Sequence, residues 1–316
     1  MILIHVLVLM LSMVIIVTFS NFFVDEVSNL AMHMNLPKML IALTIAAFGT
    51  CAPELAISFN SISSGNTDMM LANVIGSCIV NILLIIGVAA VVKPIKVKDI
   101  TIKKELPLLL IITTAFFILI SDSIFNFKNI NGLTRADGIM LLCWFIIFIL
   151  YILRIVRKNK KEIENYQTHS IIKSIITIFI SIFIIIISSD LIVETTINLA
   201  TYIGISEKII AMTVIVIGTS LPELIMTVSA AKKGEFDIAL GNIIGTNIFN
   251  MCIVLGLPVA IYGGIKSTSF TLLDTTIVLI SVLMFFIFGK SNKELTRREG
   301  ICMIIVFVIY YTYLLI

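Results

Sequence analysis

The sequence predicts an all-α integral membrane protein of ten transmembrane helices in two inverted five-helix repeats, with helices 2 and 7 broken. Three observations lead to this fold class: an apolar composition, ten apolar stretches between short charged segments, and an internal repeat with a constant offset. Of the 316 residues, 59% are hydrophobic and only 13% are charged. Soluble domains have roughly 45–50% apolar and about 25% charged residues, so this chain has too few polar side chains to cover a surface exposed to water.

The same composition excludes several functions. A net charge of +3 on so apolar a chain provides no basic face for nucleic acid. The five cysteines stand apart in apolar stretches without a CxxC pair, which indicates small buried hydrophobes and neither a disulfide framework nor a zinc site. An intramembrane enzyme is not expected either, because the chain has no GxSG serine motif, no HExxH motif and no aspartyl pair at membrane depth.

A helix that spans a membrane needs roughly 20 mainly apolar residues. Ten runs qualify, at residues 1–24, 39–62, 69–92, 106–121, 138–153, 174–200, 209–231, 238–262, 275–289 and 300–316. The first run lacks a basic start and a small-residue cleavage site, so we expect it to be retained as a helix and not removed as a signal peptide.

The distribution of Lys and Arg predicts the orientation of the spans. Eighteen of the 22 basic residues lie in connections that follow odd-numbered spans, and four lie on the opposite side. The positive-inside rule therefore places the odd-numbered connections in the cytoplasm and both termini outside the cell membrane. The longest hydrophilic connection, residues 154–173, is predicted to be a cytoplasmic linker between a first repeat at 1–153 and a second at 174–316.

An internal repeat appears when the chain is shifted by 169 residues. Residues 47–55 then align with 216–224, and residues 73–77 align with 242–246, without a gap. Five spans separate the copies, so the second copy enters the membrane from the opposite side. Inverted repeats are typical of secondary transporters, whose substrate site lies at the midplane between the two halves.

The best-matched segment is Gly-Thr-x-x-Pro-Glu, which occurs in the middle of an apolar span in each copy. Proline removes a backbone donor and clashes with the preceding turn, so both helices are expected to break near Pro53 and Pro222. Irregular backbone at this depth is tolerated where it is buried in protein or lines a cavity, and its freed carbonyls can bind ions.

Glu54 and Glu223 follow these prolines near the centres of their spans. A carboxylate at membrane depth costs about 2.5–3.5 kcal/mol even on the translocon scale and marks a functional site by default. A protonated structural glutamate is the alternative. Two carboxylates facing each other across the repeat axis are compensated most simply by a bound cation.

The third and eighth spans carry polar residues spaced by four, which places them on one helix face. The two sets are Asn73, Ser77 and Asn81, and Asn242, Thr246 and Asn250. Asn73 and Asn242 fit interhelical hydrogen bonding as well as ion binding. For Ser77, Asn81, Thr246 and Asn250 we expect ligation.

The available donors indicate the class of ion. Calcium takes roughly 6–8 oxygen ligands, and two glutamates, two asparagines, the Thr50 and Thr219 hydroxyls and loosened carbonyls supply that number. Neither motif contains histidine, and Cys51 is the single cysteine there, so zinc or copper is not expected.

These segments resemble the cation/calcium antiporter superfamily, and within it the sodium/calcium exchanger family, over essentially the whole chain. The resemblance rests on Gly-Thr-Cys-Ala-Pro-Glu at 49–54 and Gly-Thr-Ser-Leu-Pro-Glu at 218–223. It implies exchange of Ca²⁺ for Na⁺ by alternating access, with spans one and six sliding across the other eight. The ligands that it implies are Glu54 and Glu223 for both ions, Thr50, Thr219, Ser220 and the backbone of Ala47 and Val216, and Ser77 and Thr246 for flanking Na⁺ ions.

Two positions depart from the family pattern. Cys51 stands where the family usually has serine, and Asn250 stands where many members have aspartate, which makes the central pair Asn81/Asn250. These departures leave a potassium-dependent variant and a cation/proton antiporter using Glu54 and Glu223 as alternatives. A passive cation channel fits broken helices in inverted repeats less well. No cofactor is expected beyond the transported ions, and a monomer in the lipid bilayer is sufficient for transport.

Overall fold

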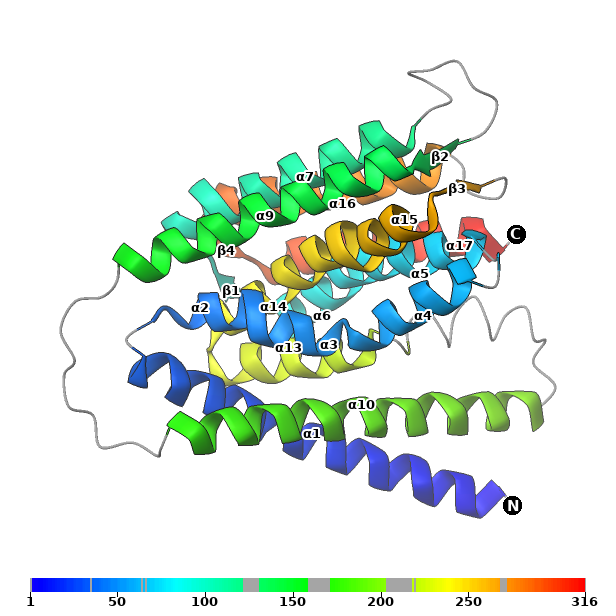
Figure 1. The fold of residues 1–316 in the computed structure, drawn as a ribbon. Coiled ribbons are helices and arrows are strands. Elements are labelled where there is room, and N and C mark those ends of the chain that lie inside the picture. The colour runs from blue at the N-terminus through cyan, green and yellow to red at the C-terminus, as the bar shows by residue number, and fades with distance from the viewer. Residues whose placement is uncertain are drawn as a thin grey trace.

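The computed structural model describes residues 2–34, 36–63, 65, 67–121, 131–158, 171–202, 218, 220–267 and 272–315. These residues are helical almost throughout, as the sequence predicts (Figure 1). The predicted linker 154–173 and the predicted seventh span 209–231 therefore lie partly outside the described residues.

The described part of the first half contains five helical stretches, some of them interrupted by π-helical segments, which are labelled η. They are α1 (Ile2–His33); α2 (Lys38–Ile41), η1 (Ala42–Ala46), α3 (Ala47–Thr50) and α4 (Ala52–Ser63); α5 (Thr67–Ile79), η2 (Val80–Ile86) and α6 (Gly87–Val92); η3 (Thr101–Glu105) and α7 (Leu106–Ile120); and α9 (Arg135–Lys158).

The described part of the second half repeats this succession. It contains α10 (Ile171–Tyr202); α13 (Leu221–Lys233); α14 (Phe236–Phe249), η5 (Asn250–Leu255) and α15 (Gly256–Tyr262); α16 (Leu272–Ser291); and α17 (Arg297–Leu315).

Helix boundaries follow the offset of the sequence repeat. Both ends of α10 lie 169 positions after the ends of α1, and both helices have 32 residues. The first residues of α13, α14 and α15 likewise lie 169 positions after those of α4, α5 and α6. The offset of 169 residues therefore holds for the positions where helices begin as well as for the polar motifs.

Several of these helices are suited to cross a membrane. Among the described residues, six are long and apolar enough, and the number is seven if the bent pair Lys38–Thr50 and Ala52–Ser63 counts as one span. In the apolar 18-residue stretch of each span, 78% of Met70–Val92 and 83% of Phe236–Tyr262 is buried inside the protein, whereas the share for Arg135–Ile155 is 22%. The third and eighth predicted spans are thus central, and α9 presents apolar side chains outward.

The connections contain four short strands that the sequence does not predict. β1 (Ile95–Lys96) pairs antiparallel with β4 (Glu294–Leu295), and β2 (Asn131–Thr134) pairs antiparallel with β3 (Gly264–Ser267). The two pairs lie at opposite ends of the molecule, and both chain termini lie at the end that carries β2 and β3 (Figure 1). This pairing gives hydrogen-bond partners to backbone groups where helices end.

Next to β1 and β4, the Lys293 ammonium forms an ion pair with Asp99 at 2.9 Å. Its hydrogen bond and positive charge hold the pKa of the exposed Asp99 carboxyl below its usual range.

Helices α1 and α10 pack side by side along one face of the molecule (Figure 1). Their apolar side chains, among them Phe23, Val27, Ile178 and Ile182, form a cluster that also contains Met226 of α13. A larger and separate apolar cluster joins most of the other helices. The α1–α10 pair is therefore a distinct layer against the rest of the bundle.

Candidate cation-binding site

The second predicted span is broken at the predicted place. α3 ends at Thr50 and α4 begins at Ala52, and the two halves of the span are bent by 47°. Cys51 at the junction has φ −78° and ψ −1°. Pro53 explains the break because it has no N–H to donate to the carbonyl one turn earlier. The break places Glu54 in the first turn of α4.

The second motif has the same local geometry where it is described. Ser220 has φ −90° and ψ 8°, and α13 begins at Leu221 with Pro222 and Glu223 in its first turn. Thr219 and Val216 lie outside the described residues, as does nearly all of the preceding half of this span. A break in helix 7 therefore stays a prediction.

Both glutamates are buried, Glu54 with 1% and Glu223 with 0% of its surface exposed. None of their four carboxylate oxygens accepts a hydrogen bond of good geometry from the described residues, and neither glutamate forms an ion pair with a described Lys or Arg. The two carboxylates lie close enough to repel each other. Buried charge without a partner is costly, so the pair is suited to hold a cation.

Thr50 lies beside this pair. Its hydroxyl donates to the carbonyls of Ala46 at 3.2 Å and Ala47 at 3.4 Å, and it lies close to the Glu223 carboxylate. The hydroxyl oxygen keeps its lone pairs for a cation. The Ala47 carbonyl also accepts a hydrogen bond from the Cys51 N–H at 3.1 Å, so an ion at this carbonyl would replace one of its two donors.

The other predicted side-chain ligands lie on the central helices and at the start of α13. Five of them are buried with side-chain oxygen or nitrogen atoms that have no partner among the described residues: Ser77, Asn81, Ser220, Thr246 and Asn250. Such atoms are rare in proteins unless they have a role or an unseen partner. Hydroxyl and amide oxygens are ligands that Ca²⁺ accepts readily. The predicted ligands that the structure describes thus come from four neighbouring helices that pack on one another.

Asn73 and Asn242 form hydrogen bonds between helices. Asn73 Nδ2 donates to the Glu54 carbonyl at 3.0 Å and to Ser58 Oγ at 3.4 Å. Asn242 Nδ2 donates to Thr227 Oγ1 at 3.2 Å. Ser58 and Thr227 are themselves 169 positions apart, so both repeats use the same interhelical hydrogen bond.

Two features of the site are not visible in the sequence pattern. The π-helical segments η2 and η5 start at or next to Asn81 and Asn250, and π-helical turns occur frequently at functional sites. Asn247 is fully buried, donates to the Ile243 carbonyl at 2.8 Å and has an unpartnered Oδ1. The repeat comparison misses Asn247 because its counterpart, Cys78, is apolar.

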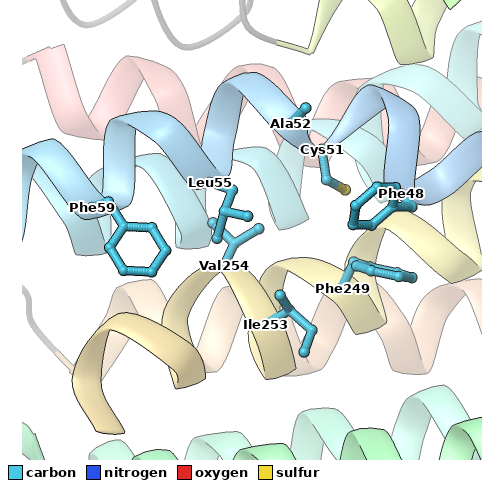
Figure 2. A pocket seen from close by; sticks show the side chains of 8 residues that line it. All are labelled: Phe48, Cys51, Ala52, Leu55, Phe59, Phe249, Ile253 and Val254. Atoms are coloured by element: carbon cyan, nitrogen blue, oxygen red, sulfur yellow. The ribbon is translucent and has the colours of Figure 1, made fainter. Parts of the chain in front are cut away.

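Cys51 lies near both carboxylates and lines an apolar cavity. Its thiol donates to the Thr246 carbonyl at 3.8 Å. The cavity has a volume of about 260 Å³, and Figure 2 shows the Cys51 side chain near Phe48 and Phe249, with Leu55 and Phe59 further along the same wall. Its lining is apolar, so a cation has no ligands there.

Among the described residues, no cluster of three or more His, Cys, Asp or Glu side chains could hold a metal ion. The candidate site has two carboxylates, those of Glu54 and Glu223. Any further ligands would be hydroxyl, amide and carbonyl oxygens.

Apolar helices of membrane-spanning length define a multi-pass membrane protein, and a pair of buried carboxylates lies among them. The family model of the sodium/calcium exchanger protein matches residues 4–154 and 173–316. The chain therefore belongs to the sodium/calcium exchanger family, which transports Ca²⁺ and Na⁺. It is a membrane antiporter for cations and not an enzyme.

Individual relatives match over nearly their whole length. The sodium/calcium exchanger MaX1 of Methanosarcina acetivorans is 30% identical over 344 residues, which cover 98% of each chain. The putative antiporter CaxA of Alkalimonas amylolytica is 33% identical over 320 residues, with 97% of each chain covered. A structure of the sodium-calcium exchanger NCX_Mj, soaked with 2.5 mM Na⁺ and 1 mM Sr²⁺, is similar with a TM-score of 0.83, 28% identity and 99% of each chain covered.

Proposed function

We propose that this protein exchanges Ca²⁺ for Na⁺ by alternating access, with the ions bound between Glu54 and Glu223. The observation that carries this proposal is the pair of fully buried carboxylates without a hydrogen-bond partner or counter-charge among the described residues. One divalent cation or two monovalent cations neutralise two carboxylates equally well. The same site can therefore hold either ion in turn, which is what an antiporter requires.

The proposed ligands are those of the motifs and of the central helices. The two carboxylates bind both ions, and the other ligands are Thr50, Thr219, Ser220, Asn81, Asn250, Ser77, Thr246 and the carbonyls of Ala47 and Val216. The burial of the described members and their unpartnered atoms support this set. Thr219 and Val216 are included in this set because they are the counterparts of Thr50 and Ala47 in the internal repeat.

We propose ten transmembrane helices in two inverted repeats, at 1–153 and 174–316, joined by the linker 154–173. The constant offset of the helix boundaries supports the repeat. β1 and β3 begin 169 positions apart and belong to pairs at opposite ends of the molecule, as an inverted arrangement requires (Figure 1).

The proposed orientation has both termini outside the cell and β1 and β4 in the cytoplasm. Its support is the excess of Lys and Arg in the connections on the β1 side.

The layer formed by α1 and α10 is the proposed moving part. Its contact with the rest of the bundle is mainly apolar, and Gly49 leaves room for the Ile182 side chain of α10 to lie directly over the helix 2 break. A mainly apolar interface allows one layer to slide over another at small cost, because few directional contacts must break. Sliding would open the carboxylate pair to each side of the membrane in turn.

Two alternatives use the same residues. A cation/proton antiporter would carry protons on Glu54 and Glu223, and a potassium-dependent exchanger would bind K⁺ next to Ca²⁺. Asn250 supports the potassium-dependent alternative, because an amide in place of aspartate removes one negative charge from the site.

Transport into proteoliposomes tests the proposal. The purified protein is reconstituted, the vesicles are loaded in turn with Na⁺, with K⁺ or at acid pH, and the uptake of ⁴⁵Ca²⁺ is measured. We expect uptake that requires internal Na⁺ and that disappears in Glu54→Gln and in Glu223→Gln. Uptake driven by a proton gradient alone would assign the protein to the cation/proton alternative.

Asp274→Asn is the matched control. Asp274 is also buried in the membrane region, but its carboxylate accepts a hydrogen bond from Tyr310 at 2.8 Å and lies on α16. We expect this variant to retain Na⁺-dependent uptake. Loss of transport in all three variants alike would show that any buried carboxylate is needed for folding, and would contradict the assignment of the site.

A further inference from the structure

A second cavity opens between α7 and α9, at the end of the molecule where α7 begins and α9 ends. Its volume is about 570 Å³, within the usual range for small-molecule sites. It is lined by residues of η3, α7 and α9 and by none of the ion-site residues. This cleft, called the α7–α9 cleft below, has no part in the proposed transport mechanism.

Two cations are part of the lining of the cleft. Lys104 and Arg154 both line it, both are exposed, and neither forms an ion pair with an acidic side chain of the described residues. Lys104 is near enough to Glu105 for an electrostatic attraction, but Glu105 is buried and is not part of the lining. The two cations are therefore available to a ligand from outside the protein.

Tyr151 fixes the wall between these charges. Its hydroxyl donates a hydrogen bond to Glu105 Oε1, which joins α9 to the end of η3. Tyr151 lines the cleft, so this hydrogen bond ties one of the residues of its wall to η3.

The rest of the lining is apolar and continues along the membrane-facing side. It consists of Pro107, Leu108, Ile111, Ile147 and Ile155. Ile111 and Ile147 are 50% and 46% exposed. A ligand that fits must therefore be anionic at one end and apolar along its length.

We propose that the α7–α9 cleft binds an anionic phospholipid, whose phosphate lies between Lys104 and Arg154 and whose acyl chain follows the apolar wall. Basic pockets between transmembrane helices bind anionic headgroups in this way. In the proposed orientation this lipid belongs to the cytoplasmic leaflet. The inference does not depend on which cation is transported.

The test compares two lipids with identical acyl chains, dioleoyl-phosphatidylglycerol and dioleoyl-phosphatidylcholine, bound to the delipidated full-length protein and measured by native mass spectrometry. Each basic residue near an anionic lipid contributes enough for a factor of about five. We expect the variant Lys104→Ala/Arg154→Ala to bind phosphatidylglycerol about 30-fold more weakly than the wild type and to lose its preference over phosphatidylcholine. Unchanged binding in this variant overturns the proposal.

Control variants separate the cleft from general attraction and from misfolding. Lys96→Ala/Lys173→Ala removes two exposed basic residues outside the cleft and is expected to keep wild-type binding; an equal loss there overturns the specific site. Lys104→Arg/Arg154→Lys conserves both charges and should bind within about threefold of the wild type. Elution at the wild-type volume in gel filtration shows that each variant is folded.

Two more measurements test the apolar wall and the source of the phosphate. Ile111→Trp fills the cleft but keeps both cations, so we expect it to weaken phosphatidylglycerol binding; full binding in this variant overturns the position of the acyl chain. Inorganic phosphate is offered as a competitor at the lipid concentration. We expect no displacement, and displacement would show that the cleft is a site for free phosphate and not for a lipid.

Discussion

Cys51 and Ser220 have nearly the same backbone conformation, with φ and ψ of −78° and −1° for Cys51 and −90° and 8° for Ser220. They lie 169 positions apart, and each stands between the two parts of a motif that ends in a buried glutamate. Because the backbone conformations are similar and the side chains are a thiol and a hydroxyl, substitutions at these two positions isolate the effect of the side-chain atom. Thiols are poor ligands for the hard cations Na⁺ and Ca²⁺, which prefer oxygen.

Exchanging the two side chains should therefore have opposite effects. We expect Cys51→Ser to lower the Na⁺ concentration for half-maximal ⁴⁵Ca²⁺ uptake about fivefold, since one added oxygen contact is worth about 1 kcal/mol. Ser220→Cys should raise that concentration by a similar factor. The measurement is Na⁺-dependent uptake in proteoliposomes. If both variants have the wild-type Na⁺ dependence, neither side chain contacts the ion.

The Asn73 amide should support both the fold and the site. Asn73→Ala removes the hydrogen bonds to the Glu54 carbonyl and to Ser58, and we expect a loss of about 1 kcal/mol of unfolding free energy. Thermal stability in detergent measures the loss. A cycle with Ser58→Ala isolates the side-chain pair, and a coupling energy near zero would contradict this hydrogen bond.

Asn242, the counterpart of Asn73 in the second repeat, provides a control for the effect of Asn73 on transport. Asn242 reaches Thr227, and no hydrogen bond from its side chain to the Glu223 carbonyl is found among the described residues. We therefore expect Asn73→Ala to reduce the apparent Ca²⁺ affinity more than Asn242→Ala does, at a similar cost in stability. Equal affinities in the two variants would mean that the carbonyl contact does not position Glu54.

Gly245 allows α14 to approach the segment that contains Ala47. A β-carbon at this position would lie 2.7 Å from the Leu43 carbonyl oxygen and 2.8 Å from Ala47 Cβ. We expect Gly245→Ala to cost about 1–3 kcal/mol, because backbone must move to admit the methyl group. Gly289→Ala is the control, since its nearest contact is the end of the Leu106 side chain at 3.3 Å. Equal melting temperatures for both variants would contradict this packing.

The ion pair between Lys233 and Asp25 joins α13 to α1 at 2.6 Å. Asp25 is 60% exposed, so the pair should add less than about 1 kcal/mol to stability. If α1 slides during transport, however, the pair favours one of the two conformations. We expect Lys233→Glu to change the turnover rate at least about twofold with little change in melting temperature, and Asp25→Lys/Lys233→Glu to restore the rate. A wild-type rate in Lys233→Glu would indicate that this contact does not change during the cycle.

Much of the architecture could be predicted from the sequence, because the membrane imposes its own rules. Apolar length gives the spans, and proline in the middle of a span gives the helix 2 break. The repeat singled out Glu54, Thr50 and their partners, because polar residues at membrane depth stand out against an apolar background.

Only the tertiary structure shows which atoms contact the buried polar side chains, because sequence periodicity does not give these contacts. It gave Asn73 and Asn242 hydrogen-bond partners on neighbouring helices, placed π-helical turns at Asn81 and Asn250, and added Asn247 to the buried polar set. It also paired β1 with β4 across about 200 positions of sequence and formed the α7–α9 cleft. The physical reason is the same in each case. The sequence by itself determined which side chains are costly in a membrane, but which atom satisfies each of them depends on helices that meet only after folding.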